Sequence, residues 1–355
     1  MKTGKVTENV LKRSILRQIK TKQREVINGA GPGEDCAIFS HGMVSCLQGG
    51  ELSVFPVESI LQKSVNILAA RGSIPIAVGL YVLLPQDAEE EQLKALMKAA
   101  EAFCSLNQMQ IAQVDARVTA AVREIYVTVM AYGAVGAELS ENAVEYMREC
   151  KDAAEDAVRH TAQGVQAGSY EDWHTVRAAK PGQDIVISKW IGLEGTAIFA
   201  DRHRESISKR YPTWLSEEAA EFRKYLSTVP EAAVALKSGV CAMHNLSEGG
   251  IFAGLWELAE GAGVGLNIDL KKLPIRQETV EICNHLNVNP YELMSGGSLL
   301  MTAKDGAALL VAFEEAGIPA AIVGRTTDSN DRIIRNEDEV RYLDRPWEDS
   351  IYAGS

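Results

Sequence analysis

Val240-Cys-Ala-Met-His-Asn-Leu-Ser-Glu-Gly-Gly-Ile-Phe-Ala-Gly-Leu-Trp-Glu-Leu-Ala-Glu260 contains the signals of a strand, a turn and a helix in immediate succession. Its first four residues form an apolar run typical of a buried strand. Ile251, Leu255 and Leu258 then recur at helical spacing and share one face. A strand followed directly by an amphipathic helix is typical of an α/β protein.

The turn inside this stretch is a candidate binding site. Gly249 and Gly250 place several backbone N–H groups at the start of the predicted helix, where an anion or a phosphate is favoured. His244 and Ser247 precede them and complete the candidate group. A tight turn that needs glycine only for its backbone conformation is the alternative interpretation.

The same alternation of helix and strand extends in both directions along the chain and predicts an α/β fold in both halves. Towards the C-terminus we expect strands at 184–188, 265–268 and 320–323, helices at 194–208, 216–227, 230–237 and 307–315, and an irregular tail at 342–346. Towards the N-terminus we expect an amphipathic helix at 11–19, helices at 60–69, 88–106 and 141–163, and strands at 35–39, 76–84, 109–114 and 124–132.

Length and composition indicate two globular domains. A chain of 355 residues is long for one core, because domains average roughly 150 residues. The small polar segment 166–170 suggests a boundary near residue 168, and therefore domains at 1–168 and 169–355. With 46% hydrophobic and 24% charged residues, the chain is neither collagen, nor a coiled-coil rod, nor disordered in bulk.

Charge and cysteine usage narrow the possible partners. The net charge of -12 argues against binding to nucleic acid or to an acidic membrane surface. The six cysteines form no C-x-x-C pair, and no run of about 18 apolar residues occurs. We therefore expect a cytoplasmic protein in a reducing compartment, without a membrane span.

Two further glycine-rich segments are candidate ligand sites. Ser295, Gly296 and Gly297 precede an apolar strand at 298–302, so a ligand could approach the backbone closely there; a β-bulge is the alternative. Gly31-Pro-Gly-Glu-Asp-Cys-Ala37 places Glu34 and Asp35 directly after a turn, an arrangement that suits Mg²⁺ with phosphate. Solvated acidic residues in a turn are the plain alternative.

Taken together and in this order, these segments resemble the aminoimidazole ribonucleotide (AIR) synthase superfamily, which includes thiamine-monophosphate kinase, selenophosphate synthetase and the HypE-type hydrogenase maturation proteins. The segment 244–260 is similar to H-D-x-T-x-G-G-x-x-x-x-L-x-E-x-A-E, and 31–37 is similar to G-x-G-D-D-A-A. Val65-Asn-Ile-Leu-Ala-Ala-Arg-Gly72 looks like V-N-D-x-A-A-x-G. The resemblance covers nearly the whole chain and is closest to the HypE-like branch.

The resemblance implies a homodimer whose N-terminal α/β domains pair into a β-barrel, each followed by a C-terminal α/β domain. It also implies that ATP and Mg²⁺ bind in a cleft between the domains, for phosphoryl transfer. The nucleotide or phosphate site would comprise Gly31, Gly33, Glu34, Asp35, Asn66, Asp115, Arg117, His244, Ser247, Gly249, Gly250, Ser295, Gly296 and Gly297. Metal ligands would be Glu34, Asp35 and Asp115.

Departures from the family pattern fall on the metal ligands. Gln48 stands where the family has a metal-binding Asp, Ile67 replaces the carboxylate after Asn66, and Arg117 takes a Glu position. Each close charge pair is worth about 4 kcal/mol at an effective dielectric of about 20, so these changes predict a degenerate magnesium site. Arg117 either contacts phosphate directly or is a surface or ion-paired residue.

Two functions remain open on this basis. One is an ATP- or phosphate-binding protein, which if catalytic would carry out ATP-dependent phosphoryl transfer. The other is a non-catalytic dimeric binding or scaffold protein that has lost the metal site. A hydrogenase-maturation dehydratase is disfavoured, because the sequence ends Tyr352-Ala-Gly-Ser355 where HypE-type proteins carry a cysteine that accepts the carbamoyl group.

Overall fold

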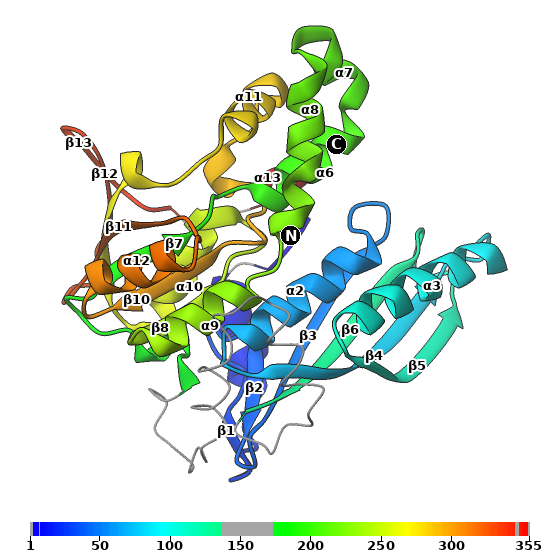
Figure 1. The fold of residues 1–355 in the computed structure, drawn as a ribbon. Helices are drawn as coiled ribbons and strands as arrows, with labels where there is room; N and C mark the ends of the chain where they lie inside the picture. Colours follow the sequence, from blue (N-terminus) through cyan, green and yellow to red (C-terminus); the bar gives the residue numbers. More distant parts are fainter. Residues whose placement is uncertain (1–2, 7, 136–172, 345–347, 354–355) are drawn as a thin grey trace. The chain divides into compact units, whose positions relative to one another are not determined.

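The computed structural model describes residues 3–6, 8–135, 173–344 and 348–353, which form two compact units of mixed α/β type, as predicted (Figure 1). The N-terminal unit comprises 23–29 and 35–168, and the C-terminal unit comprises 1–22, 30–34 and 169–355. Residues 1–22 and 30–34, which we expected in the first domain, thus pack in the C-terminal unit. The helix predicted at 141–163 lies outside the described residues.

The N-terminal unit contains one six-stranded sheet with two helices on one face (Figure 1). The strand order is β1-β2-β3-β6-β4-β5, and all neighbours are antiparallel except β4 and β5. The strands are β1 Val26–Asn28, β2 Cys36–Phe39, β3 Met43–Glu51, β4 Ile74–Leu84, β5 Gln110–Val118 and β6 Tyr126–Ala134. The helices are α2 Val57–Ala69 and α3 Glu90–Leu106.

Alternation along these strands separates a covered face from a bare one. The buried side chains, which lie on the face covered by α2 and α3, are Val44, Cys46, Val78, Leu80, Val82, Val127 and Val129. The neighbours Leu47 and Met130 pair across β3 and β6 on the opposite face and are 58% and 41% exposed. The bare face of the sheet, as we call it below, is therefore partly apolar.

The C-terminal unit is built on a seven-stranded sheet of order β13-β12-β9-β11-β7-β10-β8. Its strands are β7 Asp184–Ser188, β8 Val240–Asn245, β9 Gly265–Asp269, β10 Leu299–Ala303, β11 Ala320–Thr327, β12 Arg332–Asn336 and β13 Glu339–Tyr342. Helix α10, Gly250–Ala262, shares a core with Ile185, Ile187 and Leu300 on one face. The helices α9 Val229–Lys237 and α12 Gly306–Glu315 also pack against the sheet, α9 on β8 and α12 on β7, β10 and β11.

Helix α6, Leu193–Arg202, and the 3₁₀ turn Glu221–Tyr225 form a second, smaller core in this unit. The helices α7 Arg204–Arg210, α8 Thr213–Ala220 and α11 Gln277–Leu286 pack against α6. The single helix predicted at 194–208 is wrong in detail, because the backbone leaves the helical region at His203 (φ -111°, ψ 19°). The short helix α13, Ser350–Ala353, ends the described chain.

Three other predictions of secondary structure also need correction. The amphipathic helix expected at 11–19 is instead a series of short turns: α1 Glu8–Val10, a π turn Leu11–Ile15 and a 3₁₀ turn Leu16–Gln18. Helix α11 was missed because its sequence is mostly polar. The hairpin of β12 and β13 was not predicted, because β13 is exposed along its whole length and carries no alternating apolar signal.

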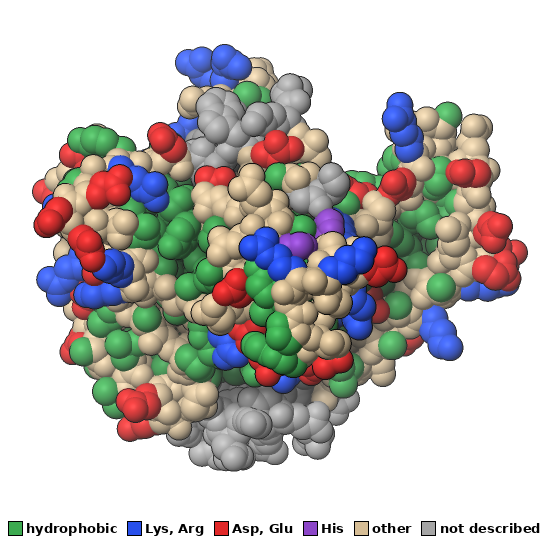
Figure 2. All heavy atoms as spheres, turned by 90° about the horizontal axis from the view of Figure 1, so that it is seen from above, with side chains coloured by type: hydrophobic (Ala, Val, Ile, Leu, Met, Phe, Trp, Pro, Cys, Tyr) green, Lys and Arg blue, Asp and Glu red, His purple; other side chains and the backbone are tan. Residues whose placement is uncertain are grey.

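Charged side chains of both signs are spread over the face that Figure 2 draws. Figure 2 shows Lys and Arg side chains interspersed with Asp and Glu rather than gathered into one basic patch. Among the described residues, no helix combines the length and apolar character needed to cross a bilayer.

Candidate functional site

The turn before α10 has a conformation that only glycine adopts without strain. Gly249 and Gly250 have φ values of 79° and 63°, in the left-handed region. The Gly250 amide donates a hydrogen bond to the Ser247 carbonyl at 3.1 Å. A Cβ atom at Gly250 would lie 2.5 Å from the Tyr291 carbonyl oxygen, so the backbone of the next loop leaves no room for a side chain.

The structure brings the two glycine turns of the C-terminal unit together. The Ser295 amide donates to the Ser247 carbonyl at 3.2 Å, and the Ser295 hydroxyl accepts a hydrogen bond from Gly192. A Cβ atom at Gly297 would lie 2.7 Å from the Tyr225 carbonyl oxygen. His244–Gly250 and Ser295–Gly297 therefore pack against each other, and the buried Ser295 hydroxyl holds them in place rather than facing solvent.

The anion that occupies the start of α10 is a carboxylate of the chain itself, which the sequence did not reveal. Asp349 accepts hydrogen bonds from the amides of Gly249 (2.5 Å), Met294 (3.2 Å) and Ile351 (2.8 Å). The residue is only 4% exposed. Burial raises the pKa of Asp349 to about 7, although the backbone donors act in the opposite direction. The Gly249 amide, predicted to bind phosphate, is thus engaged by this side chain.

His244 points towards α10 and belongs to an ionic network. Its Nε2 lies 3.0 Å from Glu257 Oε2, and Lys5 Nζ donates to Glu257 Oε1 at 2.8 Å. Burial alone would raise the pKa of Glu257, but Lys5 and His244 hold it well below its usual value. This network fixes the N-terminal segment to the middle of α10, and Lys12, which pairs with Glu260, continues it.

The turn at Gly31–Glu34 packs against the second half of α10. A Cβ atom at Gly33 would lie 2.6 Å from the Glu257 carbonyl, and one at Gly261 would lie 2.9 Å from the Pro32 carbonyl. Since a helix rises 1.5 Å per residue, Gly250 and Glu257 are about 10 Å apart along the axis. A single phosphate group cannot touch both turns, whereas an extended ligand such as a nucleoside triphosphate can span them.

A cation at this turn was not predicted. Arg177 Nε lies 3.3 Å from Glu34 Oε1, and the Arg177 guanidinium packs directly against Gly31. The Glu34 side chain is fully buried, whereas that of Arg177 is 35% exposed. Glu34 is therefore neutralised within the protein, and part of the Arg177 side chain is exposed to solvent.

Candidates in the N-terminal unit are divided between the two faces of its sheet. Asn66 lies on α2 and is 1% exposed. The pairing of β4 with β5 places Asp115 beside Tyr81 and Arg117 beside Leu83, which alternate with the buried residues of β4 and so lie on the bare face. Asn66 is thus separated from Asp115 and Arg117 by the sheet.

Among the described residues, the predicted Mg²⁺ ligands Glu34 and Asp115 already have partners within the chain. Glu34 is paired with Arg177, and Asp115 accepts a hydrogen bond from the neighbouring Ala116 amide on the face that also carries Arg117. The family's other ligand positions hold Gln48 and Ile67. Within the described ranges, no three His, Cys, Asp or Glu side chains are grouped so that they could hold a metal ion.

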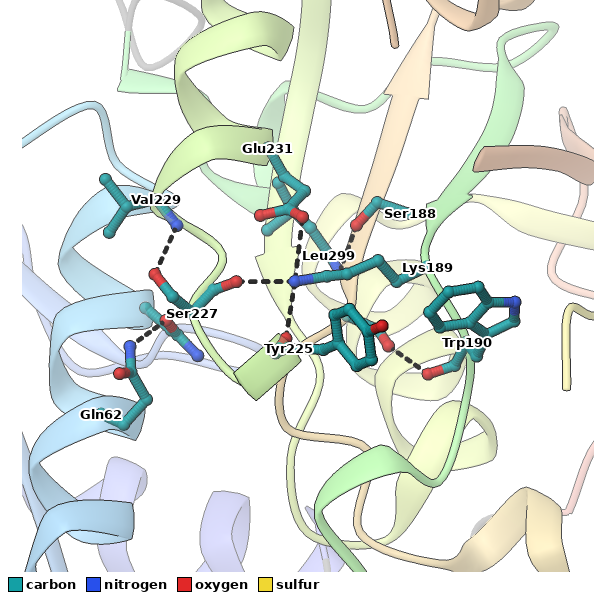
Figure 3. A network of polar contacts seen from close by, with 11 residues as sticks. Gln62, Ser188, Lys189, Trp190, Tyr225, Ser227, Val229, Glu231 and Leu299 are labelled. Atoms are coloured by element: carbon teal, nitrogen blue, oxygen red, sulfur yellow. Dashed lines mark hydrogen bonds and ion pairs between the residues drawn. The ribbon is translucent and has the colours of Figure 1, made fainter. Parts of the chain in front are cut away.

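The buried ion pair of Lys189 and Glu231 lies next to the turn at Ser295–Gly297. Lys189 donates to the carbonyls of Tyr225 (2.7 Å) and Ser227 (2.6 Å) and lies 2.9 Å from Glu231 Oε1 (Figure 3). Burial lowers the pKa of Lys189 and raises that of Glu231. Because Gly297 packs against the Tyr225 carbonyl, this pair holds the backbone on which the turn rests.

Comparison with known proteins supports the resemblance drawn from the motifs. Residues 180–335 match the family described as AIR synthase related protein, C-terminal domain. A Methanocaldococcus jannaschii protein named for hydrogenase expression and formation is 23% identical, over 93% of this chain and 90% of that protein. Carbamoyl dehydratase HypE of Rhizobium leguminosarum is 26% identical over 44% of each chain.

The fold agrees with this relationship over almost the whole length. A crystal structure of the hydrogenase maturation protein HypE in complex with ATP superposes with a TM-score of 0.62 at 15% identity, covering 98% of this chain and 97% of that chain. By sequence, residues 180–335 match the AIR-synthase-related C-terminal family, and the chain as a whole is similar to proteins of the HypE-like branch, as the motifs predicted. The solved structure shows a similar fold.

Proposed function

We propose that this protein binds ATP or another phosphate-bearing ligand along α10, between the joined turns at Ser247 and Ser295 and the turn at Gly31. The observation that carries the proposal is the hydrogen bond from the Ser295 amide to the Ser247 carbonyl, which brings two glycine turns together. Arg177, at the Gly31 turn, supplies an accessible cation for phosphate. The complex of HypE with ATP supports this choice of ligand.

Binding without metal-dependent turnover is the form of this function that the residues favour. Phosphoryl transfer relies on metal ions that neutralise the phosphates, and the carboxylates that would hold them are replaced or paired within the protein. This observation also favours the second candidate function, a dimeric binding or scaffold protein. The two differ in whether nucleotide is bound at all.

Isothermal titration with ATP tests the proposal. We expect saturable heat with a Kd that changes less than about threefold when Mg²⁺ is replaced by EDTA. Arg177→Met should weaken ATP binding by about 10- to 100-fold, since a charged hydrogen bond is worth roughly 1.5–3 kcal/mol. The control is Arg335→Met, an exposed arginine on β12. No heat at millimolar ATP would leave the scaffold function as the better account.

We also propose that the protein is a homodimer that associates through the bare face of the N-terminal sheet. Leu47 and Met130 give this face an apolar centre, and a second copy would cover it. Asp115 and Arg117 lie on the same face, so they would meet the partner rather than Asn66 of their own chain.

Leu47→Asp should dissociate this dimer. An aspartate buried without a partner costs several kcal/mol, so we expect the dimer Kd to rise at least about 100-fold. Light scattering coupled to size-exclusion chromatography measures the change. Leu106→Asp is the matched control, because Leu106 is 80% exposed at the end of α3. A wild-type monomer, or equal dissociation in both variants, would contradict this interface.

A further inference from the structure

One buried carboxylate ties together the two turns of the proposed site. Asp349 lies 100 residues after Gly249 and 55 residues after Met294, and it accepts a hydrogen bond from the amide of each. Its Oδ2 accepts the hydrogen bond from the Gly249 amide, and its Oδ1 accepts the one from the Met294 amide. The distance between these two amides is therefore set by the width of a single carboxylate group.

The two bonded amides belong to the parts of the turns that determine their shape. Gly249 is the residue immediately before α10, and Met294 immediately precedes the turn at Ser295–Gly297. A carboxylate at the start of a helix is stabilised by the helix dipole, and hydrogen bonds to an ionised oxygen are about twice as strong as neutral ones. Movement of either turn would break one of these bonds.

The segment 348–353, which contains Asp349, has other contacts that anchor it besides this carboxylate. The same segment is held by the Ser350 hydroxyl, which donates to the Asn289 carbonyl, and by the fully buried Ile351. A buried carboxylate costs free energy that a neutral side chain would avoid. Costly buried groups of this kind cluster at functional sites.

We infer that Asp349 is the positioning residue of the phosphate site: its carboxylate fixes the Gly249 and Met294 amides and so sets the spacing of the two turns that receive the ligand. This inference rests on the proposed function. Asp349 does not touch the ligand itself.

The chain offers a matched control for this role. Asp184 accepts a hydrogen bond from the Gly306 amide at 3.0 Å, at the start of α12, and so repeats the carboxylate–glycine contact away from both turns. Asp184→Asn and Asp349→Asn both change a carboxylate that accepts from a glycine amide, and Asp184→Asn also removes the ion pair with Arg325. The amide NH₂ of asparagine cannot accept a hydrogen bond, so one oxygen contact is lost in each variant.

Hydrogen exchange of the full chain, followed by titration with ATP, tests the inference. In Asp349→Asn we expect the hydrogen-exchange rate to rise at least tenfold both in the peptide that contains Gly249 and in the peptide that contains Met294. We also expect the Kd for ATP to rise at least fivefold. Asp184→Asn should raise exchange only around Gly306 and leave ATP affinity unchanged. Ser350→Ala, which loosens the same segment, should lower Tm without changing ATP affinity.

Each outcome separates this role from the proposed function. Unchanged ATP affinity in Asp349→Asn, with a lowered Tm, would show a purely structural anchor and overturn the inference alone. A wild-type protein that binds no ATP would remove the proposed function and this role with it, whatever exchange shows. If Asp349→Asn does not fold, the wild type decides: saturating ATP should slow exchange at both turns together, and no change there overturns the inference.

Discussion

Gly250→Ala is expected to lower the free energy of unfolding by about 2–5 kcal/mol, whereas Gly263→Ala, at the other end of the same helix, should cost about 1–2 kcal/mol. Both glycines are left-handed, with φ of 63° and 69°, so both variants lose the same conformational freedom. A new Cβ atom at Gly250 would meet the Tyr291 carbonyl at 2.5 Å and the Leu293 carbonyl at 2.7 Å. At Gly263 it would meet no atom within 4 Å.

Urea denaturation of the two variants and the wild type measures this difference. The alanine at Gly250 pushes on the loop that leads into Ser295, so ATP affinity should fall along with stability in that variant alone. Equal losses of stability in the two variants would mean that the backbone at Tyr291–Leu293 shifts at little cost to make room for the new methyl group. The turns before α10 and Ser295 would then not be held rigidly against each other.

Lys189→Met is expected to cost about 3–5 kcal/mol, the loss typical of breaking a buried ion pair from one side. The variant leaves the Glu231 carboxylate buried without its counter-ion, and the carbonyls of Tyr225 and Ser227 lose their donor. Lys94→Met removes an exposed pair with Glu90 on α3 and should cost no more than about 1 kcal/mol. Thermal and urea unfolding compare the two.

The pH dependence of this loss has a definite sign. Burial already raises the pKa of Glu231 above its unfolded value, and removal of Lys189 raises it further. A buried carboxyl with a raised pKa is best tolerated when protonated, so the variant gains stability as pH falls through that folded pKa. The deficit relative to wild type should therefore be smaller in acidic than in neutral buffer. A deficit that grows on acidification would contradict this account.

Local patterns were sufficient to predict much of the fold. The strand before His244, the turn and α10 follow from apolar spacing and from glycine at the positions that need left-handed backbone. The grouping of Ser247 with Ser295 was predicted from the family resemblance and is present within the C-terminal unit. Its role in binding remains a prediction.

Contacts between distant segments could not be read in the same way. Lys189 and Glu231, like Asp349 and Gly249, meet only because the chain returns to the same place, and neither partner stands in a motif that signals the other. Arg177 was overlooked for the same reason. The family pattern also suggested that Asn66 and Asp115 share one site, whereas alternation along β4 and β5 puts the sheet between them.

The N-terminal unit interrupts the C-terminal unit in the sequence, and this affects the order of events during synthesis. Residues 1–22 and 30–34 are synthesised before 35–168, but their partners in 169–355 are synthesised after it. The ion pairs of Lys5 with Glu257 and of Lys12 with Glu260 therefore form only after α10 has been synthesised. The N-terminal unit can begin to fold before that point. The long closure costs little extra entropy, about 0.6 kcal/mol per doubling of length. A fragment beginning at residue 169 would lack Lys5 and Lys12, which pair with Glu257 and Glu260 on α10.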